Sequence, residues 1–262
     1  MSTFNVILLL VGGAFAGAVN AMAGGGSMLT VPLLVLVGVP GVDANGSNRV
    51  GILTSFGVAF LSYRREGKTI DFRSMKWIIP PALVGAALGA FGISQLTDDA
   101  FETVFGLIMI PLIVLTIIKP KVAPTGDGSE HQLTVWPPAI TITVFFVIGL
   151  YAGAIQAGVG LVLLAALSRA GLDLVTANVV KVVYAFLATC IALPVFILQG
   201  AVQWVPALVL AVGLSAGGWV GAKLAVRGGE KPIRVVMLIA AAALALNLLG
   251  VWDWLAGLLF SS

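Results

Sequence analysis

Long apolar blocks separated by short polar stretches restrict the fold of this chain more than any other feature. A bilayer core about 30 Å thick requires roughly 20 apolar residues for each helix that crosses it. Blocks close to that length recur along the whole sequence, at 4–22, 42–61, 77–96, 100–118, 135–157, 174–198, 204–226 and 233–249. Shorter apolar runs lie at 27–37, 159–167 and 251–260.

Composition excludes a water-soluble domain. Charged residues make up 10% of the chain and hydrophobic residues 60%, whereas about 25% of the residues in soluble domains are charged. The apolar blocks also lack the alternation of a membrane β-barrel, and an open sheet would leave backbone groups unpaired in lipid. We therefore expect an all-α polytopic membrane protein.

Internal repetition divides the chain into two related halves. When the chain is shifted by about 135 positions, the segment 13–21 matches 149–157, and an ordered series of such matches indicates a duplication. Further pairs are Gly38 with Gly171, Asn45 with Asn178, Gly85 with Gly217, and Gly89 with Gly221. We expect transmembrane repeats at 1–118 and 135–262, joined by a polar cytoplasmic linker at 119–134.

The distribution of Lys and Arg predicts opposite orientations for the two repeats. Basic residues in short loops prefer the cytoplasmic side, which here marks as cytoplasmic the segments 64–76, 119–121 and 223–234. The turns at 98–99 and 199–200 contain no Lys or Arg and should face outward. An odd number of crossings between the linker and 199–200 requires 135–167 to be a helical hairpin, and the same reasoning makes 4–37 a hairpin.

Each repeat is then a helical hairpin with a short broken arm, followed by three spanning helices. The first repeat starts outside and ends inside, and the second does the reverse, so both termini are expected outside. Inverted-topology repeats with interrupted helices are typical of secondary transporters, which hold their substrate near the bilayer midplane.

The chemistry is expected at the tips of the two hairpins. In the first tip, three glycines precede a short helix for which Ser27 is a natural N-cap, and a helix N-terminus with exposed N–H groups attracts anions. The alternative interpretation of the glycines is close helix packing. The predicted substrate-binding residues of the tips are Asn20, Gly24, Gly25, Gly26, Ser27, Thr30, Gln156, Gly158 and Gly160.

Two basic residues follow the hairpins at nearly equivalent positions. Arg49 lies beside Asn48, and Lys181 follows Asn178, with Asn48 and Lys181 at matching places in the repeats. Each of these four residues is a candidate for substrate contact, because a cation within a span is costly and usually functional. Snorkelling to the interface is the alternative for Arg49 and Lys181.

These residues resemble the TauE/SafE family of sulfite and organosulfur-anion exporters. The segments that carry the resemblance are 20–32, 38–40, 43–49 and, more weakly, 149–160. The resemblance implies a multi-pass permease of the inner (plasma) membrane that exports sulfite, sulfoacetate, another sulfonate or a related small anion. The second half departs from the family pattern, since only Gly158 and Gly160 stand where a fuller glycine cluster is common.

Other classes remain as alternatives. An anion channel would use the same anion chemistry, whereas a membrane enzyme would need clustered carboxylates or a histidine at the tips, and the lone His131 lies in the linker. We expect no catalytic residue, metal ligand, cofactor or nucleic-acid partner. Proton or sodium coupling through Asp43 or Asp173 stays open beside helix capping by these residues, and so does the oligomeric state.

Overall fold

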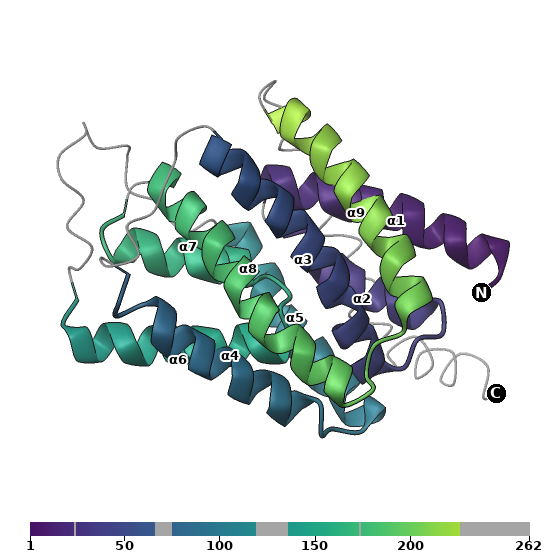
Figure 1. Cartoon of the computed structure of the whole chain (residues 1–262), viewed down its shortest axis with the longest axis horizontal. Coiled ribbons are helices and arrows are strands. Elements are labelled where there is room, and N and C mark those ends of the chain that lie inside the picture. Colours follow the sequence, from purple (N-terminus) through teal and green to yellow (C-terminus); the bar gives the residue numbers. More distant parts are fainter. Residues whose placement is uncertain (24, 66–74, 119–135, 173, 226–262) are drawn as a thin grey trace, which may run out of the picture.

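The computed structural model describes residues 1–23, 25–65, 75–118, 136–172 and 174–225, and within these residues every regular element is an α-helix (Figure 1). The helices are α1 Thr3–Ala23, α2 Ser27–Leu36, α3 Gly41–Arg65, α4 Ile79–Ile93, α5 Asp98–Ile118, α6 Pro138–Ala154, α7 Val159–Arg169, α8 Leu174–Leu198 and α9 Trp204–Ala225. The all-helical class is confirmed. The predicted linker, the predicted span at 233–249 and the short apolar run at 251–260 lie outside the described residues.

Glycines end three of these helices in the same way. Gly38 after α2, Gly171 after α7 and Gly200 after α8 have φ values of 91°, 95° and 72°. In each case the next residue donates its N–H to the carbonyl five residues back, as in Val39 to Leu34 at 3.1 Å. This Schellman arrangement needs a left-handed residue, which glycine adopts without a Cβ penalty.

Most of the predicted apolar blocks coincide with helices of nearly the predicted length or longer, whereas the blocks 77–96 and 135–157 form shorter helices. By length and composition, two described helices could cross a membrane, at Thr3–Asn20 and Val179–Leu198. Shorter apolar stretches lie at Ser27–Leu36, Ile79–Ile93 and Pro138–Ala154, and at Trp204–Val220 within α9. Their exposed faces carry large apolar side chains such as Val84 and Trp219, which is consistent with a membrane protein because soluble proteins rarely expose wide apolar surfaces.

Small residues bring two pairs of helices into close contact. Helix α1 packs along α9 on one side of the molecule, and α4 packs along α6 on the other (Figure 1). A Cβ added to Gly17 would overlap the carbonyl oxygen of Leu214, and one added to Gly153 would overlap that of Ala86. The repeated glycines of α1 and α6 therefore permit close backbone approach, as small residues do in membrane helix pairs.

The packing corrects one part of the predicted pairing between the halves. On α4, Gly85 and Gly89 face Phe146 and Leu150 of α6. On α9, the residues that face the equivalent positions of α1 are Gly213 and Gly217, one helical turn before the predicted Gly217 and Gly221. The reason is that the connection from α3 to α4 is longer than the one from α8 to α9.

Candidate functional site

The two hairpins are present, with tips that differ slightly from the predicted ones. Helix α1 continues through Asn20 to Ala23, and α2 begins at Ser27, so half-buried Asn20 lies in the last turn of α1 rather than in the break. The second break covers 155–158, which places Gly160 inside α7. Gly24 lies outside the described residues.

The tips of the two hairpins touch each other. The backbone N–H of Gly158 donates to Oγ of Ser27 at 3.2 Å, across 131 positions of sequence. The prediction that Ser27 caps α2 is wrong, because Gly26 is the N-cap residue and no side chain caps this helix end. The hydroxyl of Ser27 instead joins the two hairpins, while Thr30 donates to the Ser27 carbonyl at 3.1 Å.

Gly25 and Gly26 are buried at the first tip. A Cβ on Gly26 would overlap the carbonyl oxygen of Ala16 in α1, so close packing explains this glycine. The alternative interpretation of the glycine cluster therefore holds for at least one of its members.

The second tip has an unusual backbone. Gln156 and Gly158 have φ values of 64° and 66°, and Gln156 is the one residue other than glycine with a positive φ among those described. A bulky residue rarely adopts this region, and such residues cluster where function requires them. The hydroxyl of Tyr151 donates to the carbonyl of Ala157 and helps to hold the turn.

Arg49 lies fully buried against this second tip. Its Nη1 donates to the Ala152 carbonyl and to Oε1 of Gln156, both at 3.1 Å, and its Nη2 donates to the Gly153 carbonyl. Carbonyls in the last turn of a helix lack intrahelical partners and favour a nearby cation. Snorkelling is thus wrong for Arg49, which instead binds the C-terminal end of α6.

Asn45 supports the same helix end, although it was not among the predicted site residues. Its Nδ2 donates to the carbonyl of Ala154 at 2.6 Å. The signal that could have found it was its match with Asn178 in the repeat. The side chain of Asn178 lies outside the described residues.

Several polar atoms of this cluster have no hydrogen-bond partner. Within the described part of the chain, these buried atoms include Oδ1 of Asn45, Oδ1 and Nδ2 of Asn48, and Nε of Arg49. No carboxylate of the described residues pairs with Arg49, whose guanidinium lies 4.7 Å from the ring centroid of Phe196. The cluster therefore carries a buried positive charge together with unused donors and acceptors.

Lys181 is buried in α8 but does not join this cluster. Arg49 contacts Phe196, which is fifteen residues further along α8 than Lys181, or roughly 22 Å at 1.5 Å per residue. Near Lys181, α8 instead meets the opposite end of α3, where Phe60 stacks on Phe186. The structure thus separates the two predicted basic residues.

The acidic residue considered for coupling lies at a helix start. Asp43 is in the first turn of α3 and accepts a hydrogen bond from Nε2 of Gln203 at 3.2 Å. This position favours the helix-capping interpretation, while Asp173 lies outside the described residues.

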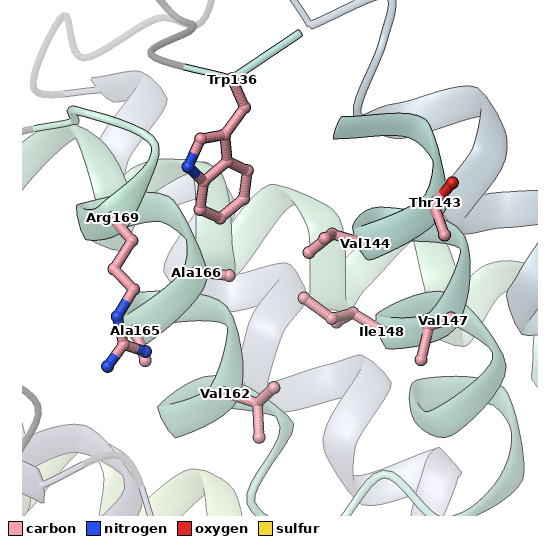
Figure 2. Close-up of a pocket in the computed structure, with 9 residues that line it drawn as sticks. All are labelled: Trp136, Thr143, Val144, Val147, Ile148, Val162, Ala165, Ala166 and Arg169. Carbon is pink, nitrogen blue, oxygen red and sulfur yellow. The ribbon is translucent and has the colours of Figure 1, made fainter. Parts of the chain in front are cut away.

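An open groove of about 450 Å³ between α6 and α7 contains none of the predicted site residues (Figure 2). Apolar side chains such as Val147 and Val162 line most of it, with Trp136 and Arg169 at its margin. Its lining offers one charged side chain, so the polar cluster at the hairpin tips is the better candidate for binding a polar substrate.

Comparison with known proteins agrees with the resemblance seen in the sequence. The model of the family described as sulfite exporter TauE/SafE matches residues 9–248. Similar proteins include "Probable membrane transporter protein ORF9" from Sinorhizobium sp., which is 31% identical over 251 residues and covers 94% of this chain and 93% of its own length.

Another relative is "Probable membrane transporter protein YfcA" from Escherichia coli (strain K12), 26% identical over 259 residues, with 95% of this chain and 94% of its own length covered. No solved structure matches the chain significantly. The relatives are named as membrane transporters and not as enzymes. The helical fold, the paired hairpins and these matches lead to one conclusion, that the chain belongs to the sulfite exporter TauE/SafE family of membrane transporter proteins.

Proposed function

We propose that this transporter is a multi-pass inner-membrane permease that exports a small sulfur oxyanion or organosulfur anion, such as sulfite, sulfoacetate or another sulfonate. The observation that carries the proposal is Arg49, fully buried beside the contact between the hairpin tips and without a carboxylate partner among the described residues. A buried guanidinium strongly favours an anion with two or more oxygens, because it can donate to both at once.

Two inverted-topology repeats, 1–118 and 135–262, would supply the mechanism. Helix α3 is the equivalent of α8, and the two run antiparallel, since Gly46 meets Phe196 and Gly57 meets Phe186. The relation between the halves therefore reverses the chain direction, which supports inverted repeats around the tips. Alternating access then consists of rocking one repeat against the other around a site at their interface.

The tip contact supports a carrier over an anion channel. The hydrogen bond between Gly158 and Ser27 links the two breaks inside the helical bundle, whereas an open channel needs a continuous water path between them. In this proposal the contact breaks and re-forms as the site opens to one side and then to the other. A membrane enzyme is the weaker alternative, because the described residues of the tips contain no carboxylate or histidine.

Counterflow in proteoliposomes tests the proposal. Vesicles that contain the purified protein and unlabelled sulfite should accumulate labelled sulfite transiently above equilibrium, because a carrier exchanges the two. Flux without such an overshoot would show a channel. The proposal fails if the protein moves none of sulfite, sulfonates or sulfate, even if it moves short carboxylates.

A further inference from the structure

Buried polar atoms of Asn45, Asn48 and Arg49 on α3 have no hydrogen-bond partner among the described residues. They favour a ligand that offers more than a negative charge. We infer that Asn45, Asn48 and Arg49 form one binding site for an oxyanion that also carries its own hydrogen-bond donor. Such a ligand is a hydroxyalkyl- or aminoalkylsulfonate or the hydrogen form of sulfite. This inference rests on the proposed function and narrows its substrate class.

The three side chains form one face of a helix. Asn45, Asn48 and Arg49 stand at positions i, i+3 and i+4 of α3, where side chains are neighbours. All three are fully buried. Contacts to Ala154 and Gln156 turn this face toward the second hairpin tip, so the ligand would lie at the junction of the two repeats.

The hydrogen-bond donors of this binding site suit an oxyanion. The Nη1 atom of Arg49 already has two partners, whereas Nε has none among the described residues. Nη2 carries two hydrogens and donates one hydrogen bond, to the Gly153 carbonyl. The hydrogen of Nε and one hydrogen of Nη2 lie on the same edge of the planar guanidinium, and this edge can bind two oxygens together when the other Nη2 hydrogen serves Gly153. Nδ2 of Asn48 adds a further donor.

The hydrogen-bond acceptors of this binding site cannot be satisfied by an oxyanion that has no donor of its own. Oδ1 of Asn45 is identified as the free atom because its amide nitrogen must face the Ala154 carbonyl, which can only accept. Both amide atoms of Asn48 are free, so exchanging them leaves one acceptor in either case. A buried acceptor that stays unsatisfied destabilises the complex, and a ligand hydroxyl or amine removes that penalty.

The described residues contain no second copy of this binding site. At the positions equivalent to Asn48 and Arg49, the second half has Lys181 and Val182, and Lys181 lies away from the cluster, as its distance along α8 shows. We therefore expect one anion per chain and not two symmetric sites.

A pair of matched ligands tests the inference on the purified full-length protein in nanodiscs. 2-Hydroxyethanesulfonate and propanesulfonate have the same charge and nearly the same size, and differ by a hydroxyl in place of a methyl group. Calorimetric titration should give one site and at least about tenfold tighter binding of the hydroxyl compound, since sites built around a substrate hydroxyl reject analogues that lack it.

Asn48→Leu should remove this preference, with both sulfonates then binding about equally. Thr141→Val is the matched control, because Thr141 is a buried threonine of α6 whose hydroxyl has a partner in Pro137, and it should keep the preference. The comparison of the two sulfonates on the wild-type protein does not depend on whether any variant folds. Equal binding of both ligands by the wild-type protein overturns the inference, as does an unchanged preference in Asn48→Leu.

A wrong substrate class and a wrong proposed function give different experimental results. If the wild-type protein exchanges sulfite but does not distinguish the two sulfonates, ordered water satisfies the asparagines, and only the present inference is wrong. If the protein neither binds nor moves any sulfur oxyanion, the proposed function itself is wrong.

Discussion

Replacing Arg49 with glutamine should weaken both anion binding and the fold. The guanidinium serves three acceptors, Ala152, Gly153 and Gln156, and a glutamine amide can reach one of them. Each of the two remaining buried acceptors costs about 1–3 kcal/mol, partly offset because the charge no longer has to be buried. We expect the free energy of unfolding to fall by about 2 kcal/mol.

The effect on the ligand should be larger than the effect on the fold. Removing one partner of a buried charged contact costs about 2–5 kcal/mol, which corresponds to roughly 30-fold or greater loss of affinity. Calorimetric titration with sulfite measures this loss, and thermal unfolding of the same samples measures stability.

Arg65→Gln is the matched control, because Arg65 ends α3 in a segment expected to be cytoplasmic. It should bind sulfite like the wild-type protein. If Arg49→Gln is destabilised and yet binds sulfite with wild-type affinity, Arg49 only caps α6, and the reasoning about the anion is refuted. Equal losses in both variants would mean that the two arginines act through general surface charge.

The other expectations concern the glycines and the orientation. Gly26→Ala should lower the melting temperature sharply in detergent, because its Cβ would overlap backbone of α1. Gly218→Ala should be tolerated, since a Cβ there would contact no neighbouring element among the described residues. Gly25→Leu should abolish sulfite exchange while leaving the protein in the membrane fraction, and normal flux would exclude a role for the first tip in transport. A reporter fused after Ser262 should be external, with 64–76 accessible from the cytoplasm; a cytoplasmic reporter signal would contradict the inverted repeats.

Much of the architecture could be predicted because it depends on short stretches of sequence. The apolar blocks, the breaks before Ser27 and Val159, and the glycines that end α2 and α7 each depend on neighbouring residues, through hydrogen bonds within a helix or its end. The repeat also indicated that the breaks belong together. These features could be read without any knowledge of how the helices pack.

The chemistry of the candidate site required the tertiary structure. Pattern alone made Ser27 a helix cap and placed Arg49 and Lys181 at nearly equivalent positions. In the structure, Ser27 contacts Gly158 of the other hairpin, and Arg49 of α3 contacts Phe196, far along α8 from Lys181.

The sequence by itself thus determined the apolar helices and their breaks, because these depend on local hydrogen bonding and on the thickness of a bilayer. The two repeated halves stay a prediction from the sequence. Only the tertiary structure decided which polar atoms meet and which stay unpaired, as with Asn48 and the free edge of Arg49. The physical reason is that such contacts depend on the rotation and register of helices more than 100 residues apart in the chain, which no local pattern contains.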